Sequence, residues 1–204
     1  MILKLTGLII FSYLIGSFPS AYFAGKIKKG IDIRRHGTGN VGATNVLLVV
    51  GPVFAILVYI IDVLKGLLPV LLARNIIGTD LSMGLAGIAA VLGHDFSIFL
   101  KFSGGKGVAT TTGVMFGIHS LIASIVISAW VVFVVITDNF ILSSLLCMLY
   151  IPILMCSFRL SSTYVIFGIL YFLAGLFTHR EDVVTIMNGQ GNKALSAVRK
   201  YFSR

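Results

Sequence analysis

The sequence is poor in charged residues and in cysteine. Only 11% of its 204 residues are charged, and 57% are hydrophobic, whereas an ordinary soluble domain is about one quarter charged. So few polar residues cannot cover a water-facing surface, which excludes a soluble globular domain, and the high hydrophobicity excludes disorder. The two cysteines, Cys147 and Cys156, form neither a CxxC pair nor a metal-ligand spacing, and we expect both to be core residues. What remains is an integral membrane protein, expected to form one domain over residues 1–204.

Long apolar runs supply the positive evidence for a membrane protein. A helix needs about 20 apolar residues to cross a bilayer. The runs that reach or approach this length are Ile2–Gly25, Val46–Ala73, Leu81–Leu100, Leu121–Ile136, Phe140–Cys156 and Thr163–Phe177. The run Val108–Ile118 is shorter, and its length alone argues against a span. The first run leads into further apolar sequence, so we expect a span there and not a cleaved signal peptide.

The distribution of positive charge argues for keeping the short run as a seventh span. The net charge is +9, and cytoplasmic loops of membrane proteins carry the excess of lysine and arginine. Seven spans with the N-terminus outside place twelve of the sixteen basic residues inside, with Lys4, Arg74 and Arg159 outside and Lys65 within a span. Six spans would divide these residues eight against seven, which is no bias. We therefore predict an all-α polytopic membrane protein with about seven transmembrane helices, its N-terminus outside and its C-terminus cytoplasmic.

The first predicted cytoplasmic loop is rich in glycine, hydroxyl and amide groups. It contains a GxGxxG pattern at Gly37, Gly39 and Gly42, but a dinucleotide site requires a preceding strand, and a membrane helix precedes this loop. Glycines let backbone N–H groups approach an anion, and a helix that begins near Thr44 would present its positive N-terminus. A tight turn with a helix N-cap at Thr44 or Asn45 explains the same residues equally well.

The second predicted cytoplasmic loop contains Gly104, Gly105, Lys106 and Gly107, followed by an apolar helix. This pattern is typical of an anion-binding loop with a positive charge at its centre. It is not a Walker A loop, because Gly107 stands where a serine or threonine should follow the lysine. A flexible basic loop that only sets the membrane orientation is the alternative. Two such loops on one face favour a substrate that carries phosphate.

Three titratable residues outside the two loops are candidates for a role. His179, at the end of the last span, could act as a base or hydrogen-bond donor, or cap the helix end. Asp62 and Lys65 lie three residues apart within the second span, where ionisable residues are functional or paired, and we favour a buried structural pair. The sequence contains no cluster of metal-ligand spacing, so we predict no metal and no cofactor. The basic residues lack interleaved aromatic residues, so we expect no nucleic-acid partner.

Together the motifs resemble the bacterial acyl-phosphate:glycerol-3-phosphate acyltransferases, a family of small integral-membrane enzymes. The resemblance covers nearly the whole chain and is carried by residues 16–22, 31–46, 62–66, 93–99, 104–110 and 179–180. The first motif departs from the family at Thr38, which replaces a serine, and at Leu48, which replaces an arginine. The last motif has Asp182 in place of an asparagine and Gly191 in place of a glutamate, and the second motif has Ser97 in place of a proline.

The resemblance implies that a fatty acyl group passes from acyl phosphate to the 1-hydroxyl of glycerol 3-phosphate. The products would be lysophosphatidic acid and phosphate, in the first acylation step of phospholipid biosynthesis. The substrate hydroxyl would attack directly, without a cofactor, at the cytoplasmic face of the bacterial inner membrane. The acyl chain would lie between helices, open to membrane lipid.

The resemblance also implies roles for individual residues. The second loop would hold glycerol phosphate, the first loop would hold the acyl-phosphate headgroup and the developing oxyanion, and His179 would orient or deprotonate the hydroxyl. The catalytic residues would be His179, Thr38, Asn40 and Asn45. The substrate-binding residues would be Arg34, Gly39, Gly42, Thr44, His94, Gly104, Gly105, Lys106 and Gly107.

Two other interpretations stay open. The departures at Leu48, Asp182 and Gly191 fit a diverged paralogue with weak or no acyltransferase activity. A small anion transporter is the second alternative, although the spans contain few ionisable residues and the sequence has no inverted repeat of interrupted helices.

Overall fold

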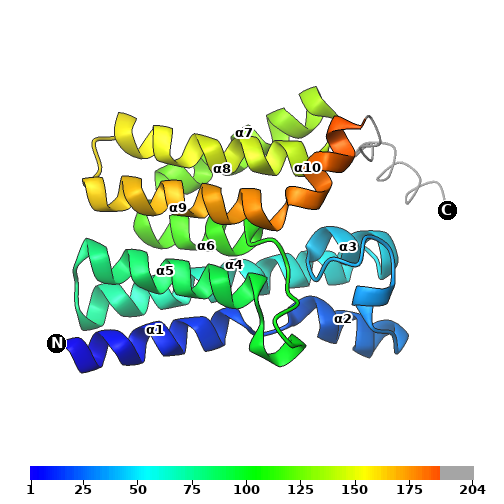
Figure 1. Ribbon diagram of the computed structural model, residues 1–204, viewed down its shortest axis with the longest axis horizontal. Helices are drawn as coiled ribbons and strands as arrows, with labels where there is room; N and C mark the ends of the chain where they lie inside the picture. Colours follow the sequence, from blue (N-terminus) through cyan, green and yellow to red (C-terminus); the bar gives the residue numbers. More distant parts are fainter. Residues whose placement is uncertain (189–204) are drawn as a thin grey trace. The chain divides into compact units, whose positions relative to one another are not determined.

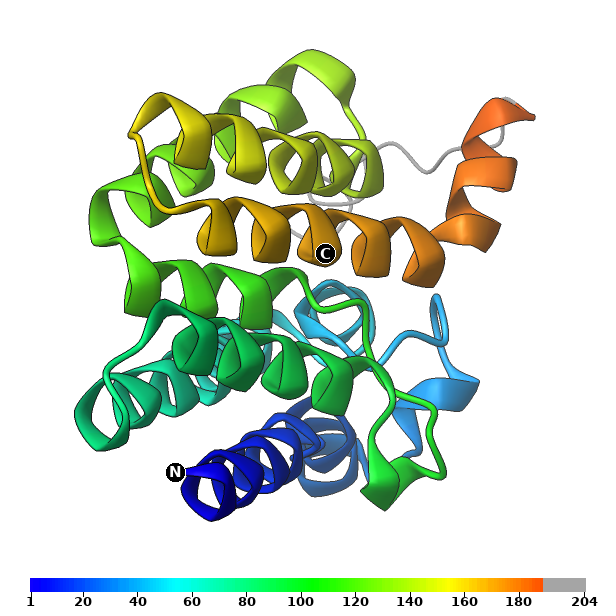
Figure 2. The ribbon, with the colours of Figure 1, turned by 60° about the vertical axis from the view of Figure 1, so that its left-hand side comes forward.

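The computed structural model describes residues 1–188, and the chain divides into two compact units, Met1–Ser120 and Leu121–Arg204. All regular structure in the described residues is helical, so the all-α class is confirmed (Figures 1 and 2). The first unit contains α1 (Ile2–Gly16), α2 (Ser20–Lys29), η1 (Ile33–Arg35), α3 (Ala43–Val49), α4 (Pro52–Ile76), α5 (Asp80–Asp95), η2 (Ile98–Leu100) and α6 (Val108–Ile118). The second unit is formed by α7 (Ser120–Thr137), α8 (Phe140–Ser157), α9 (Ser162–Thr178) and α10 (Arg180–Met187). The prediction of a single domain stays a prediction.

Helix α4 is the centre of the first unit, because all five other α-helices of that unit contact it. Its contact with α6 is close because each helix presents a glycine to the other's backbone. A Cβ atom on Gly66 would overlap with the carbonyl oxygen of Thr110, and a Cβ on Gly113 would overlap with that of Val63. Small residues of this kind let membrane helices approach until their backbones touch.

The first predicted span, Ile2–Gly25, is two helices in the structure. Helix α1 ends at Gly16 and α2 begins at Ser20, after Pro19. The break leaves backbone carbonyls without helical partners, and such groups must be satisfied inside a membrane protein. The Phe18 carbonyl accepts a hydrogen bond from Lys65 Nζ at 3.0 Å, and the Ser17 carbonyl accepts one from Ser97 Oγ at 2.6 Å. Side chains of distant helices therefore stabilise the break.

The second predicted span, Val46–Ala73, is also divided. Helix α3 ends at Val49, and Gly51 adopts a φ of 131°, a conformation that strongly favours glycine. Pro52 then occupies the first turn of α4, where its missing N–H has no helical partner to lose. The short run Val108–Ile118, in contrast, forms α6 with the predicted bounds.

In the second unit, α8 and α9 pack against each other, and α10 bends away from α9 by 65° (Figure 2). Asn139 begins α8 because its Oδ1 accepts hydrogen bonds from the backbone N–H groups of Ile141 and Leu142, at 2.9 and 3.0 Å. Cys147 is buried and Cys156 is exposed. The core prediction is therefore confirmed for Cys147 and wrong for Cys156.

The described residues contain five helical segments that are long and apolar enough to cross a membrane, or six when the bent pair α9 and α10 counts as one span. Helices α1 and α2 together count as a single segment, Ile2–Lys29. The polytopic membrane class is therefore confirmed. The count of seven and the sidedness of the termini stay predictions.

Candidate functional site

The two glycine-rich loops lie at the same end of the first unit. Figure 2 shows the η2 segment near the segment that joins α2 to α3, on the side of the first unit away from the N-terminus. One hydrogen bond joins them directly, from Arg34 Nη1 in η1 to the carbonyl of Leu100 in η2, at 3.4 Å. Residues 66 positions apart in the sequence are thereby brought together.

Asn45 holds the first loop in shape. Its side chain is fully buried, and its amide nitrogen donates to the carbonyls of Ile33, His36 and Asn40 at 3.2, 3.0 and 2.9 Å. Its Oδ1 accepts from the backbone N–H of Thr38 at 2.9 Å. Both ends of the amide are therefore used within the loop. This geometry supports a positioning role for Asn45, and its predicted catalytic role stays untested.

The other predicted residues of the first loop lie on its surface or partly buried. Gly37 and Gly39 have φ values of 62° and 74°, so the turn between η1 and α3 requires the left-handed conformation that glycine tolerates. Thr38 is exposed, and its Oγ1 accepts from the backbone N–H of Asn40 at 3.3 Å. Thr44 is exposed in the first turn of α3. The N-cap of α3 is Gly42, so the prediction of an N-cap at Thr44 or Asn45 is wrong.

The second loop rests on the end of α5. The backbone N–H of Gly105 donates to the carbonyl of His94 at 3.0 Å. A Cβ on Gly105 would overlap with the His94 ring, and a Cβ on Gly104 would overlap with the His94 carbonyl oxygen. Lys106 is partly buried, and Gly107 has a φ of 70° and begins α6 as its N-cap. The predicted residues of this loop therefore lie together, and Gly104 and Gly105 pack directly against His94.

Asp95, the last residue of α5, packs against the same loop, close to Gly104 and Gly107. A Cβ on Gly107 would come within 2.9 Å of Asp95 Oδ1. The carboxylate is buried, and neither oxygen accepts a hydrogen bond within residues 1–188. Close approach to this carboxylate and the positive φ together explain why position 107 holds a glycine. No sequence pattern indicated this contact between Gly107 and Asp95.

A buried ionic cluster connects the second loop to the break between α1 and α2. Asp62 and Lys65 form an ion pair of 2.8 Å with side chains 1% and 5% exposed, which confirms the predicted pair. The same carboxylate accepts from Ser20 Oγ at 2.6 Å, and its Oδ1 lies 3.9 Å from Nδ1 of His94. The ion pair was expected from helical spacing, whereas Ser20 and His94 join it only through the fold.

We expect Lys65→Met to lower the free energy of unfolding by about 3–5 kcal/mol, since removing one partner leaves an uncompensated buried charge. Among residues 1–188, Asp62 would then keep the Ser20 hydroxyl as its one hydrogen-bond donor. Replacing both charges, in Asp62→Leu/Lys65→Met, should recover most of the loss. Unfolding of the purified protein in micelles measures both effects, with Lys4→Met, at an exposed position, as the control. A loss below about 1 kcal/mol for Lys65→Met would contradict the assignment.

Asp32 fixes the side chain of Arg34. Asp32 Oδ2 lies 2.7 Å from Arg34 Nη2, and Asp32 Oδ1 accepts from Arg34 Nε at 3.0 Å. The hydrogen bond from the Arg34 side chain is the main cause that lowers the pKa of Asp32 to about 2, and the same bond raises the pKa of Arg34. The carboxylate therefore stays ionised throughout the neutral range. Arg34 is held as a paired cation, with its Cζ 5.6 Å from the centre of the Tyr22 ring.

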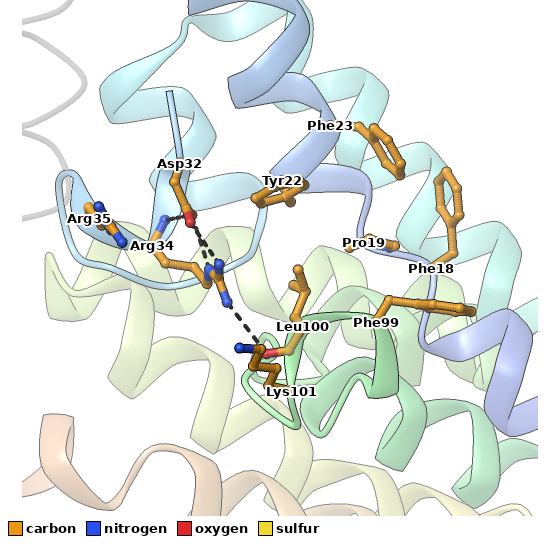
Figure 3. Close-up of a pocket in the computed structure, with 10 residues that line it drawn as sticks. All are labelled: Phe18, Pro19, Tyr22, Phe23, Asp32, Arg34, Arg35, Phe99, Leu100 and Lys101. Carbon is orange, nitrogen blue, oxygen red and sulfur yellow. Dashed lines mark hydrogen bonds and ion pairs between the residues drawn. The ribbon is translucent and has the colours of Figure 1, made fainter. Parts of the chain in front are cut away.

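A pocket of about 710 Å³ opens beside this pair. Of the predicted site residues, Arg34 alone lines it within the described part of the chain. Figure 3 shows aromatic rings on one side of the pocket and basic side chains on the other. The lining residues are Phe18, Pro19, Tyr22, Phe23, Asp32, Arg34, Arg35, Phe99, Leu100 and Lys101.

His179 belongs to the second unit, at the bend between α9 and α10. Its side chain is 3% exposed, and its Nδ1 lies 2.8 Å from the carbonyl oxygen of Gly175. A carbonyl oxygen only accepts hydrogen bonds, so Nδ1 carries the hydrogen and Nε2 is the basic nitrogen of the neutral ring. The fold therefore fixes both the orientation and the tautomer of this histidine.

Two of the three positions that motivate the paralogue interpretation, Leu48 and Asp182, lie within the described residues. Leu48 is 40% exposed on α3, and Asp182 is half-buried in the first turn of α10. Gly191 lies outside the described residues. Within residues 1–188, no three His, Cys, Asp or Glu side chains are grouped as metal ligands.

Comparisons with known proteins agree with this arrangement. A family model described as glycerol-3-phosphate acyltransferase matches residues 6–189. A glycerol-3-phosphate acyltransferase of Thermotoga petrophila is 40% identical over 90% of this chain and 93% of its own length, and one of Alkaliphilus metalliredigens is 39% identical over 91% and 93%. A crystal structure of PlsY, an integral membrane glycerol 3-phosphate acyltransferase, in its glycerol 3-phosphate form has a TM-score of 0.86 and 32% identity, with 93% and 95% of the two chains covered. The chain belongs to the glycerol-3-phosphate acyltransferase family.

Proposed function

We propose that this chain transfers a fatty acyl group from an acyl phosphate to the 1-hydroxyl of glycerol 3-phosphate, as the first acylation of phospholipid biosynthesis. The observation that carries the proposal is the pair of glycine-rich, basic loops that meet at one end of the first unit of a family member. Both substrates carry phosphate, so each loop has a group to bind. The related PlsY was crystallised in glycerol 3-phosphate and lysophosphatidic acid forms.

The second loop binds the phosphate of glycerol 3-phosphate in this proposal. Backbone N–H groups of Gly104, Gly105 and Gly107 supply donors, and Lys106 supplies the positive charge. The loop is held by the Gly105 hydrogen bond to His94, so His94 acts as a positioning residue. The N-terminus of α6, which follows Gly107 at once, adds a partial positive charge.

The first loop binds the acyl-phosphate headgroup and the oxyanion that develops on the carbonyl. Thr38, Gly39, Asn40, Gly42 and Thr44 provide hydroxyl, amide and backbone donors on or near the surface of this loop. Asn45 keeps these groups in place, since its own amide is used within the loop. Arg34 contributes positive charge that is partly balanced by Asp32.

The reaction needs no covalent intermediate on the protein. The 1-hydroxyl oxygen attacks the carbonyl carbon, a new ester bond forms, and the bond between that carbon and the phosphate oxygen breaks, which releases inorganic phosphate. The hydroxyl proton passes to Nε2 of His179 or to a phosphate oxygen of the substrate. An acyl phosphate is already activated, so positioning and charge neutralisation supply most of the rate acceleration.

The basic residues set the orientation of the site in the bacterial inner membrane. Both loops contain or adjoin lysine and arginine residues, and the end of α2 adds Lys26, Lys28 and Lys29. Positive charge of this density is retained on the cytoplasmic side of a membrane. We therefore place the two loops at the cytoplasmic face.

A donor-resolved turnover assay tests the function. Protein reconstituted in lipid receives labelled glycerol 3-phosphate with either palmitoyl phosphate or palmitoyl-CoA. We expect labelled lysophosphatidate from palmitoyl phosphate and none from palmitoyl-CoA. Product from palmitoyl-CoA alone would contradict the donor assignment. Failure of both donors, in protein shown to be folded, would favour a diverged paralogue in which Leu48 and Asp182 have cost the activity.

A further inference from the structure

The pocket between the α1–α2 break and the two loops has an apolar wall. Phe18 and Phe23 lie on either side of the start of α2, with ring centres 5.5 Å apart and planes inclined by 22°. Phe99 of η2 faces the same space (Figure 3). The three residues are 44%, 45% and 60% exposed. Exposed rings beside a charged region are typical of a membrane–water interface, where acyl chains begin.

The opposite wall of the pocket carries net positive charge. Arg34, Arg35 and Lys101 contribute three positive charges and Asp32 one negative charge, which leaves +2. Asp32 pairs with Arg34, so the excess lies on Arg35 and Lys101. Both are exposed, and within residues 1–188 neither side chain forms a hydrogen bond or an ion pair. The basic wall therefore has donors available for an anion.

We propose that this pocket, where η1 meets η2 beside the glycine-rich parts of the two loops, binds one anionic phospholipid of the surrounding membrane. The phosphate contacts Arg35 and Lys101, and the start of an acyl chain packs against Phe18, Phe23 and Phe99. A volume of about 710 Å³ suits a headgroup with its first methylene groups. The excess of two positive charges selects an anionic headgroup over a zwitterionic one, whose net charge is zero.

A lipid fits this pocket better than a small soluble anion for one reason. Inorganic phosphate would contact the basic wall and leave the exposed faces of the three aromatic rings uncovered, whereas an amphiphile covers both walls at once. The two basic residues also come from different loops, Arg35 from η1 and Lys101 from the residue after η2. A bound phosphate would therefore add a second link beside the Arg34–Leu100 hydrogen bond.

Native mass spectrometry of the purified protein with added palmitoyl-oleoyl phosphatidylglycerol tests the charge requirement. We expect the wild type to bind one such lipid at least about tenfold more tightly than Arg35→Gln/Lys101→Gln, because each basic residue near a headgroup strengthens binding severalfold. Lys28→Gln/Lys29→Gln removes the same charge from the end of α2, outside the pocket, and should bind like the wild type. Equal affinity of the wild type and Arg35→Gln/Lys101→Gln would overturn the proposal.

Two further arms identify the ligand. Phe99→Ser should weaken binding of the lipid, and a tenfold excess of inorganic phosphate should not displace it from the wild type. Displacement by inorganic phosphate would assign the pocket to a small anion and overturn the lipid proposal. Equal affinity for palmitoyl-oleoyl phosphatidylcholine would show that the pocket does not select an anionic headgroup, which would also overturn the proposal. Thermal unfolding of each variant shows that it is folded. The binding measurement requires no turnover, so its outcome is independent of the proposed acyltransferase reaction.

Discussion

Gly104→Ala is expected to reduce acyl transfer by about 100-fold or more. A Cβ at this position would overlap with the backbone carbonyl oxygens of His94 and Asp95. These atoms belong to the last turn of α5 and cannot rotate away as a flexible side chain would. The second loop must therefore shift, and a displacement of about 1 Å in a positioning group can cost about 100-fold in rate.

Gly7→Ala is the matched control for this substitution. Gly7 lies in the middle of α1, and a Cβ there would have no atom within 4 Å. Alanine also favours a helix over glycine by about 0.5–1 kcal/mol, so this variant should keep wild-type turnover and stability. Turnover with palmitoyl phosphate measures both variants. Gly104→Ala with more than a third of wild-type turnover would show that the second loop does not position substrate.

The sequence predicted helices well where they depend on local signals. The helix after the second loop has the predicted bounds, 108–118, and its role as a membrane span stays a prediction. The break at Gly51-Pro52 has a local signal too, since glycine followed by proline marks a turn, but the hydropathy of the run concealed it. The break before α2 was harder to predict, because Lys65 and Ser97, which satisfy its carbonyls, lie 47 and 80 residues away.

In the candidate site, too, local patterns indicated some features, whereas contacts between distant segments determined the others. Residue types and spacing indicated both loops and His179 as candidates, which stay predictions, and they indicated the Asp62–Lys65 pair, which the structure confirms. The sequence could not show that His94 supports Gly105, or that Arg34 reaches the second loop, because those contacts depend on how α5 packs in the first unit. The aromatic and basic walls of the pocket come from separate segments, so no single motif indicated them.

Asn45→Asp should reduce turnover by about 100-fold or more, although it changes one NH₂ group to an oxygen. The amide nitrogen of Asn45 donates to the carbonyls of Ile33, His36 and Asn40. A carboxylate oxygen in its place would face the same three carbonyl oxygens, and each buried polar group left unsatisfied costs about 1–3 kcal/mol. The first loop is expected to open, because the three carbonyl oxygens can then accept hydrogen bonds from water instead of facing a carboxylate.

Asn75→Asp makes the same chemical change at an exposed position of α4 and should leave turnover unchanged. Hydrogen exchange separates loop opening from loss of the fold: in Asn45→Asp, the backbone N–H of Thr38, which donates to Asn45 Oδ1 in the wild type, should lose protection while α4 and α5 keep theirs. Wild-type turnover together with fast exchange at Thr38 would show that the closed first loop is not required for catalysis. Wild-type protection at Thr38 would show that Asn45 does not hold the loop. The two readouts thus test the structure of the loop and its role in the reaction separately.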